Sequence, residues 1–515
     1  MKLLPSGIAR AVFVTGLCWY GLSCTREPDG ETLARQTCSS CHVFPEPAML
    51  DKASWATGVL PQMAVWAGVT PLTEAPGMGF NDDMVRILTS GVLPARPLVT
   101  PAAWKRIVDW YVSQAPDSLL PDSLPAAAFQ PLEGQFGVQS VPGFEGHEVT
   151  LLQHDSLRHL LVAGTRTGGL YWLDPLTGVR RDSFRFGSPP TSISLLDQHR
   201  FILALPGVME PNDKQQGSLI RARRMGDTLA REQVIRQLAR PVHVTWADIT
   251  GDGIPESVVS EYGHYAGQLA WYSQDGNQPD PHVLYAASGT IKTIVQDMNG
   301  DGRPDIVALT GQGREGVWIY YNQGGGQFQA QYVLSFPSVY GSLDLELADL
   351  NQDGHMDLLY ANGDNADRSP ILKPYHGVRI FLNDGHNQFS QAYFFPLHGA
   401  MKVMARDFDL DGDLDIAATA FFPDYSRRPH LGFIYLRQDG PLVFTPHATA
   451  ATDTGRWMLM DAYDADRDGD LDIVLGACSM IPGQATTVRR SADKVSIVML
   501  RNEAVSRHNS AHQVP

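Results

Sequence analysis

Two cysteines and a histidine near the start of the chain have the spacing that covalent haem attachment requires. They are Cys38, Cys41 and His42, in the order Cys-Ser-Ser-Cys-His. Two thiols three positions apart on one helical turn reach both vinyl groups of one porphyrin, and the adjoining imidazole then serves as the proximal iron ligand. A disulfide is the alternative interpretation, but it would not require the adjoining histidine. The motif predicts one covalent haem c and redox chemistry.

Three methionines are candidates for the second axial ligand of that iron. The residues 91–100, which precede the last helical pattern of this region, contain no methionine. Met63 follows a helical pattern led by Trp55 and is preferred over Met78, whereas Met84 is expected to pack in the core. An iron open to water is the alternative, and it would shift the chemistry from electron transfer toward ligand binding or peroxidatic reactions.

Acidic or polar residues recur five times at positions 1, 3, 5 and 9 around a glycine at position 6. So many carboxylates repel one another unless a hard cation lies between them, and oxygen ligands on a tight turn suit Ca²⁺. We expect about five calcium ions, with the backbone carbonyl of position 7 as a further ligand; solvated turns without metal are the alternative. The predicted ligands are Asp248, Thr250, Asp252, Ile254 and Glu256 in the weakest loop, then Asp297, Asn299, Asp301, Arg303 and Asp305, then Asp349, Asn351, Asp353, His355 and Asp357, then Asp407, Asp409, Asp411, Asp413 and Asp415, and finally Asp464, Asp466, Asp468, Asp470 and Asp472.

The elements around these loops are strands. The loops begin 49, 52, 58 and 57 residues apart, and each is followed by a short apolar run such as Asp-Ile-Val-Ala-Leu. A period of this length with several strands per unit predicts a β-propeller rather than EF-hands. Two units without an acidic loop, 148–186 and 191–238, bring the expected number of blades to seven. A spare strand at 135–141 is expected to complete the last blade and so remove an exposed sheet edge.

The first residues predict export. Residues 1–23 combine basic Lys2 and Arg10 with an apolar run too short to span a membrane, so they indicate a signal peptide. The following Cys24 completes a sequence that resembles a bacterial lipobox, which implies lipidation there; a plain signal peptide or an uncleaved anchor is the alternative. We expect a periplasmic or outer-membrane location facing the periplasm or the cell surface, with membrane contact only through the lipid.

The composition excludes some partners. The formal net charge is −16, which argues against nucleic acid or an anionic membrane surface as the principal partner. With 43% apolar residues, 48 glycines and 35 prolines, the chain is expected to be rich in turns and to bury more than one core.

The five acidic loops resemble the FG-GAP or VCBS repeats of integrin-type propellers, and the residues 28–115 resemble a small class I cytochrome c. Together they resemble the haem-bearing VCBS-repeat lipoproteins of bacteria. The resemblance implies a multidomain protein in which a small all-α cytochrome domain, 28–115, precedes an all-β propeller, 131–503. The residues 116–130 are expected to be a linker that keeps the two cores separate, and 504–515 a polar tail.

Polar loops that join the blades are the candidate ligand-binding residues of the propeller. They are 261–265, 362–367 with His376, and 423–430, while His243, Lys292, Lys402 and Arg456 are expected to add positive charge at the mouth of the central tunnel. Ordinary solvated loops and satisfied core groups are the alternative.

Electron transfer is the favoured function, with a redox partner protein and a propeller that binds the partner or a substrate. A cell-surface module that binds carbohydrate or protein is the alternative, as is a dehydrogenase acting on a small or sugar-like substrate. No catalytic triad, phosphate loop or dinucleotide fingerprint is present in the required context, so the enzyme question stays open. The segment 169–178 has a faint likeness to quinoprotein repeats, which carries little weight because only one unit shows it.

Overall fold

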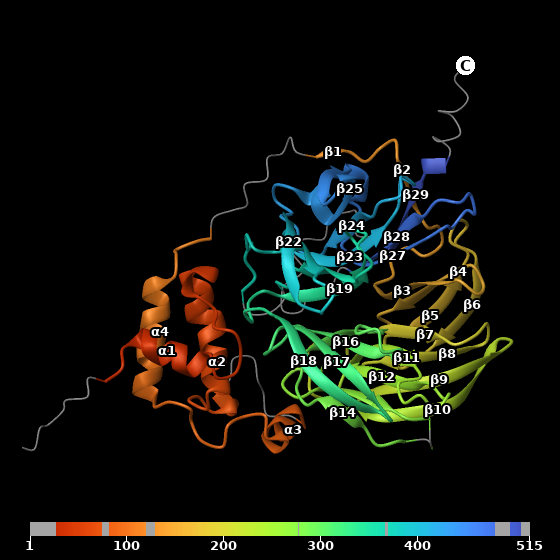
Figure 1. Cartoon of the computed structure of the whole chain (residues 1–515). Helices are drawn as coiled ribbons and strands as arrows, with labels where there is room; N and C mark the ends of the chain where they lie inside the picture. Colours follow the sequence, from red (N-terminus) through yellow and green to blue (C-terminus); the bar gives the residue numbers. More distant parts are fainter. Residues whose placement is uncertain are drawn as a thin grey trace, which may run out of the picture.

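The computed structural model describes the residues 27–74, 82–119, 129–274, 276, 278–365, 369–478 and 495–505. A helical segment lies beside a β-propeller, and the chain passes from one to the other once (Figure 1). Among these residues, no helix has the length and hydropathy needed to cross a membrane. Cys24 and Met78 lie outside the described residues, so their predicted roles stay predictions.

Two capped helices form the frame of the helical segment. Helix α1, Gly30–Cys38, begins where the Asp29 carboxylate accepts a hydrogen bond from the Thr32 N–H at 2.9 Å. Helix α4, Pro101–Gln114, begins at Thr100, whose hydroxyl accepts the Ala103 N–H at 3.2 Å. Such side chains satisfy backbone donors that have no partner inside the helix. The two helices pack together, and the buried face of α4 carries Trp104, Ile107 and Tyr111, as the sequence pattern predicts.

The helical pattern at 52–66 is interrupted in the structure. The π-helical turn η2, Ser54–Val59, precedes helix α2, Leu60–Trp66. Pro61 has no N–H to donate to the preceding turn, and the Leu60 N–H reaches back five residues to the Trp55 carbonyl. The remaining helices are η1, Pro47–Met49, η3, Leu72–Glu74, and α3, Asp82–Ser90. Met84 is buried in α3, as expected.

Seven sheets, each with four antiparallel strands and one with an added fifth strand, form the propeller, which confirms the predicted number of blades. In six blades the second strand is buried along its whole length, because neighbouring blades cover both of its faces. The strands are, in blade 1, β3 Val149–Asp155, β4 Leu160–Thr165, β5 Gly169–Leu173 and β6 Arg180–Arg185; in blade 2, β7 Ser192–Leu195, β8 Arg200–Leu205, β9 Gly217–Met225 and β10 Thr228–Leu238; in blade 3, β11 Pro241–Ala247, β12 Glu256–Glu261, β13 Gln268–Tyr272 and β14 His282–Tyr285; in blade 4, β15 Thr290–Gln296, β16 Asp305–Thr310, β17 Gly316–Gly324 and β18 Gln327–Ser335; in blade 5, β19 Ser342–Ala348, β20 Asp357–Asn362, β21 Gly377–Asn383 and β22 Phe389–Pro396; in blade 6, β23 Ala400–Arg406, β24 Asp415–Ala420, β25 Phe433–Gly440 and β26 Val443–Ala448; and in blade 7, β27 Trp457–Tyr463, β28 Asp472–Ala477 and β29 Ile497–Asn502. Short helices η5, Pro429–Gly432, and η6, Ala450–Thr452, lie in blade connections.

The N-terminal strand closes the ring, as predicted. Strand β2, Phe136–Ser140, pairs antiparallel with β29 and becomes the fourth strand of blade 7. One detail differs: strand β1, Gln130–Pro131, pairs in parallel with β26 of blade 6, so residue 130 belongs to the propeller rather than to the linker. Strand β2 therefore covers the edge of β29 that the last blade would otherwise leave open.

The expected separation of the two cores is wrong. Tyr265 of the propeller is 3% exposed and packs in one apolar cluster with Val65, Leu72, Met84 and Ile87 of the helical segment. Backbone contacts join the parts too, since Val43 and Pro337 form a parallel bridge. Burial of apolar surface therefore fixes the helical segment against the propeller, which a sequence reading based on linker composition does not reveal.

One buried carboxyl group between blades 4 and 5 leads to a prediction about pH. Glu315 is fully buried and accepts the backbone N–H of Ser342. Burial raises the pKa of Glu315 from 4.5 to about 8, so between these values the folded protein holds a proton that the unfolded chain releases. The free energy of unfolding contributed by this group therefore falls as the pH rises from about 4.5 to about 8.

The substitution Glu315→Gln keeps an acceptor for Ser342 and removes the ionisation, so we expect a flatter pH dependence than in the wild type. Urea unfolding at several pH values between about 5 and 8 measures it. Asp227→Asn, on the exposed turn between β9 and β10, is the matched control. Equal slopes for the wild type and Glu315→Gln would contradict the prediction.

Candidate functional site

A cavity of about 660 Å³ lies between the helical segment and the propeller. Its helical wall comes from the end of α1, from α2 and from the segment that precedes α4. Its propeller wall comes from connections in blades 3, 4 and 5, namely those between second and third strands and those between successive blades. In antiparallel blades these two kinds of connection share one face. The volume falls in the range of about 300–1,000 Å³ found for small-molecule and cofactor sites.

The structure brings the predicted haem ligands to this one cavity. Cys38, Cys41, His42 and Met63 all line it. Both cysteines are free thiols, so they are not joined in a disulfide. The Nδ1–H of His42 donates to the Val43 carbonyl at 2.9 Å, and burial lowers the pKa of the imidazole. A neutral ring that donates from Nδ1 carries its lone pair on Nε2, which is the tautomer needed for metal ligation through that atom.

The lining of the cavity is apolar on the helical side and polar on the propeller side. Val59, Trp66, Leu98 and Trp104 stand on the helical side. The propeller contributes the polar residues His264, Tyr265, Gln312, Arg314, Asp364, Ser369 and Lys373. The predicted loops 261–265 and 362–367 thus reach the cavity through His264, Tyr265 and Asp364, whereas 423–430 is not among the residues that line it. Ala366 and Asp367 lie outside the described residues.

Tyr265 joins the two walls of the cavity, and no sequence pattern predicted its partners. Its ring stacks on Trp66 with centroids 5.0 Å apart, and its hydroxyl accepts a hydrogen bond from the Gln62 side chain. Asp213, from the connection between β8 and β9, accepts the N–H groups of His264, Tyr265 and Ala266 at 2.8 to 3.1 Å. Successive N–H groups of this kind form a small anion-binding nest, and here a buried carboxylate of the same protein fills it.

The central tunnel carries less positive charge than expected. Lys292 and Lys402 both form ion pairs with the buried Asp344, at 3.0 and 3.2 Å. Arg456 stacks on Phe421 and donates to the Tyr425 hydroxyl at 2.9 Å. Burial, followed by the two lysines, lowers the pKa of His243 to about 3, so this imidazole is neutral near pH 7. These groups therefore satisfy one another inside the fold.

In all five acidic loops the ninth residue is buried behind the loop. Its carboxylate accepts the backbone N–H of the second loop residue at 2.9 to 3.2 Å, in the pairs Glu256 with Ile249, Asp305 with Met298, Asp357 with Leu350, Asp415 with Phe408 and Asp472 with Ala465. In the last four loops it also accepts an N–H from the third strand of its blade at 2.8 to 2.9 Å. This residue joins loop and blade in addition to any role as a metal ligand.

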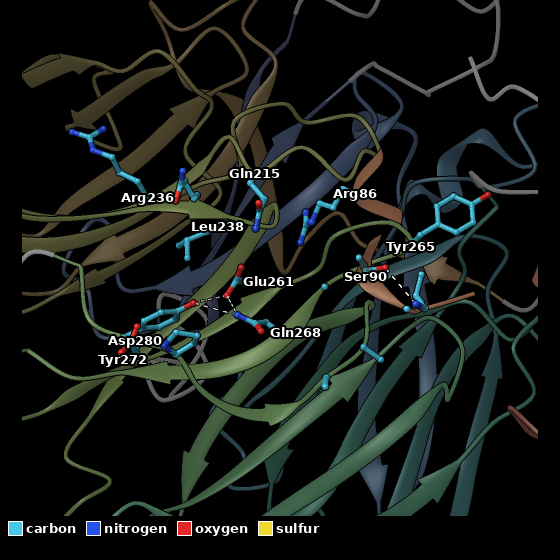
Figure 2. A pocket seen from close by; sticks show the side chains of 18 of the residues that line it. Arg86, Ser90, Gln215, Arg236, Leu238, Glu261, Tyr265, Gln268, Tyr272 and Asp280 are labelled. Atoms are coloured by element: carbon cyan, nitrogen blue, oxygen red, sulfur yellow. Dashed lines mark hydrogen bonds between the residues drawn. The ribbon is translucent and has the colours of Figure 1, made fainter. Parts of the chain in front are cut away.

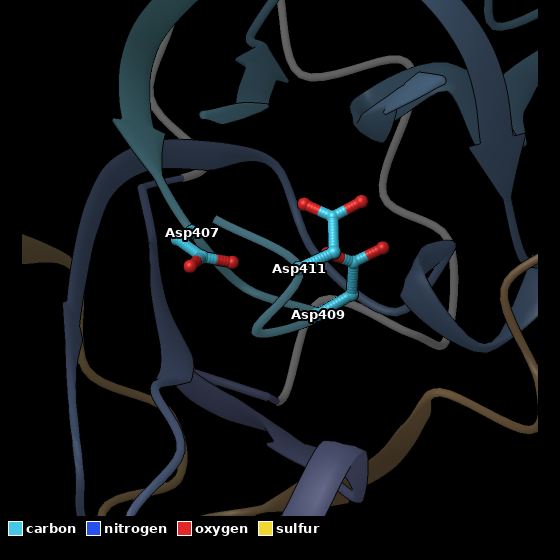
Figure 3. Close-up of side chains that lie close together, drawn as sticks. All are labelled: Asp407, Asp409 and Asp411. Atoms are coloured by element: carbon cyan, nitrogen blue, oxygen red, sulfur yellow. The ribbon is translucent and has the colours of Figure 1, made fainter. Parts of the chain in front are cut away.

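Two of the five loops gather carboxylates closely enough to share a cation. Ligand atoms of Asp407, Asp409 and Asp411 lie within 4.8 Å of one another (Figure 3), as do those of Asp464, Asp466 and Asp472. Buried oxygens of Asp407, Asp409 and Asp466 have no hydrogen-bond partner. Burial, followed by the nearby Asp411, raises the pKa of Asp409 to about 6, which reflects the cost of keeping these charges together.

The first three loops are closed by hydrogen bonds of their own. Asp248 accepts the N–H groups of Gly251 and Gly253 at 2.7 and 2.9 Å. In the second loop the Asn299 amide donates to Asp301 at 3.1 Å, and Arg303 forms an ion pair with the same carboxylate at 2.5 Å. Among the described residues, these loops hold no group of three carboxylates as compact as those in the last two loops. In this respect the second and third loops resemble the first loop rather than the last two.

Comparison with known proteins places a repeat family on part of the chain. The family described as FG-GAP-like repeat matches the residues 248–308 and 297–360, which contain the first three acidic loops. Among solved structures, the chain is similar to the WD40 domain of Neurospora crassa Pan2, with 15% identity, 66% of this chain and 91% of that chain covered, and a TM-score of 0.41. It is also similar to the β-propeller domain of Myceliophteria thermophila Cps50 (Swd1), with 12% identity, 71% and 99% covered, and a TM-score of 0.43. No curated protein matches the chain. The protein thus contains FG-GAP-like repeats in a seven-bladed β-propeller.

The nest filled by Asp213 leads to a prediction about the wall of the cavity. Asp213→Ala removes an acceptor of three backbone N–H groups and leaves them buried without a partner, a change that costs about 1–3 kcal/mol per group. We expect amide hydrogen exchange at residues 264–266 to accelerate at least tenfold, measured by mass spectrometry. The exposed Asp227→Ala should leave these amides unchanged. Unchanged protection in Asp213→Ala would show that packing of Tyr265 alone holds the loop.

Proposed function

We propose that the protein is an exported c-type cytochrome whose haem lies in the cavity between the helical segment and the propeller. The observation that carries this proposal is the convergence of Cys38, Cys41, His42 and Met63 on one cavity of about 660 Å³. Cys38, Cys41 and His42 are close in sequence at and just after the end of α1, whereas Met63 comes from α2, so its place in the same cavity is not a consequence of sequence proximity. On this proposal the helical segment is a small cytochrome domain.

The residues of the cavity fit a covalently bound haem. Cys38 and Cys41 would hold it through thioethers, and His42 and Met63 would be the axial ligands. A haem attached there supplies a one-electron redox couple. The hydrogen bond from His42 Nδ1–H to the Val43 carbonyl orients the ring and keeps the Nε2 lone pair available. Trp66 and Trp104 line the helical side with apolar surface, and an apolar surrounding of this kind is one means by which a protein sets a redox potential.

The propeller on this proposal encloses the haem and binds the molecule that exchanges electrons with it. Connections from blades 3, 4 and 5 form the second wall of the cavity, so the haem would lie against the propeller rather than on a separate domain. Propeller connections of this kind present polar loops on one face, which suits a binding module for a redox partner or a small molecule. Export and lipidation at Cys24 belong to the same proposal and rest on the N-terminal sequence alone.

We further propose that the acidic loops bind calcium and that the last two loops bind it most tightly. Their support is the pair of three-carboxylate clusters together with buried carboxylate oxygens that have no partner. The loops connect first to second strands, so they lie on the face of the propeller opposite to the cavity. A calcium ion in such a loop has a structural role, because it offsets the repulsion among carboxylates that folding brings together.

The haem proposal predicts which thiols are needed for covalent attachment. Cys38→Ala combined with Cys41→Ala is expected to abolish covalent attachment, so that acid-acetone extraction leaves no haem on the chain and the intact mass falls by that of one haem. Cys478→Ala is the matched control, because this cysteine is buried in the propeller and does not line the cavity. Met63→Ala is expected to retain the covalent haem, since the thioethers do not depend on the axial side chain. Haem that leaves the wild type with the solvent would refute covalent attachment.

The calcium proposal predicts a melting temperature that depends on free metal. An ion that binds only the folded protein stabilises it by about 2.7 kcal/mol per site at a hundredfold excess over its dissociation constant. Chelation with EGTA is expected to lower the melting temperature, and Asp411→Ala should remove more of the calcium-dependent part than Asp252→Ala in the first loop, because only Asp411 belongs to a compact cluster. A melt that is indifferent to both calcium and EGTA would contradict the proposal.

A further inference from the structure

A second pocket, of about 560 Å³, lies beside the cavity and has a different character. Helix α3 contributes Arg86 and Ser90, and the ends of strands in blades 2 and 3 contribute the opposite side (Figure 2). Tyr265, Gly91 and Val92 line both the pocket and the cavity. The two spaces are thus neighbours separated by the same tyrosine that stacks on Trp66.

A buried hydrogen-bonded group forms the floor of this pocket. Glu261 is 2% exposed and accepts the Gln268 amide at 2.7 Å and the Tyr272 hydroxyl at 2.6 Å (Figure 2). Its other oxygen accepts the Ala239 N–H at 2.6 Å. Burial and the adjacent Glu261 raise the pKa of Tyr272, so its hydroxyl stays protonated. Both oxygens of Glu261 therefore accept hydrogen bonds from neutral groups of the fold.

The charges around the pocket balance. Arg86 and Arg236 supply two cations, while Glu261 and Asp280 supply two carboxylates. The rest of its polar lining is uncharged: the Gln268 amide donates to Glu261, the Gln278 amide exchanges hydrogen bonds with the Arg236 backbone, and Gln215 and Gln237 are exposed. A ligand of either charge would meet groups of its own sign as well as of the opposite sign, so a net charge gains nothing here. Amides and phenols both donate and accept hydrogen bonds, and so do the hydroxyl groups of a neutral ligand.

We propose that this pocket binds a neutral, polyhydroxylated small molecule such as a monosaccharide or polyol. This inference rests on the proposed function and names the class of ligand that the propeller would bind. A ligand there would lie against Tyr265, with Trp66 and the haem motif on the other side of that ring. A ligand bound in this pocket is therefore placed to affect the proposed redox centre.

The test is isothermal titration calorimetry of the full chain with neutral probes, namely glucose, galactose, mannose, xylitol and myo-inositol, and with charged probes, namely the anion gluconate and the cation glucosamine. We expect at least one neutral probe to bind and the charged probes to bind at least tenfold more weakly. Gln268→Ala and Gln215→Ala should each weaken the neutral probe about tenfold, because each removes one hydrogen-bonding group from the pocket. Gln323→Ala, an exposed glutamine of β17 outside both spaces, should not.

Several outcomes would overturn the proposal. They are no heat with any neutral probe at millimolar concentration, equal or tighter binding of a charged probe, or binding unaffected by both Gln268→Ala and Gln215→Ala. Gln215 is exposed, so its substitution tests the pocket even if Gln268→Ala does not fold. Repeating the titration with the variant that lacks Cys38 and Cys41 separates this proposal from that of the haem. If the variant without haem binds a polyol, the proposal for the pocket holds independently of the haem. If the wild type carries covalent haem but binds no polyol, the proposal for the pocket is wrong and the haem proposal is unaffected.

Discussion

The architecture of the propeller depends on a carboxylate that is buried at the ninth position of each acidic loop. It accepts an N–H from its own loop and, in four blades, an N–H from the third strand, so the loop cannot move without breaking hydrogen bonds in the blade. Asparagine side chains link two of these blades to the blade before. Asn322 donates to the Ile249 carbonyl at 2.8 Å, and Asn502 donates to the Phe408 carbonyl at 2.7 Å. A charge removed from water in this way is stable only with such partners.

The rigid ring in turn presents one face to the helical segment. That face consists of the connections opposite to the acidic loops, and it supplies half of the cavity wall. Asp213 fixes the connection that carries Tyr265, and Tyr265 then reaches into the core of the helical segment. The acidic loops and the cavity therefore lie at opposite ends of the same strands, which separates a stabilising role from a binding role within one fold.

The proposed redox function depends on this contact as well. A haem in the cavity would have the helical segment on one side and propeller loops on the other, including the fully buried Lys373, whose ammonium donates to Asn365 and to the Ser369 carbonyl at 2.5 and 3.0 Å. The surroundings that tune such a centre are then shared between two parts of the chain. Substitutions in blades 3 to 5 would act on it even though the haem motif is far away in sequence.

The sequence by itself determined what local pattern can encode. The Cys-x-x-Cys-His motif, the five acidic loops, the number of blades and the closing strand β2 were all predictable, because covalent spacing, turn chemistry and strand periodicity depend on neighbouring residues. The π-helical turn at Ser54–Val59 was not predicted, although Pro61 gives its cause. The tertiary structure alone decided that two cores meet at Tyr265, that Lys292 and Lys402 share Asp344 as an ion-pair partner, and that, among the described residues, two of the loops cluster three carboxylates. These features depend on side chains tens to hundreds of residues apart, such as Gln62 and Tyr265, and complementary packing between distant elements leaves no periodic mark in the sequence.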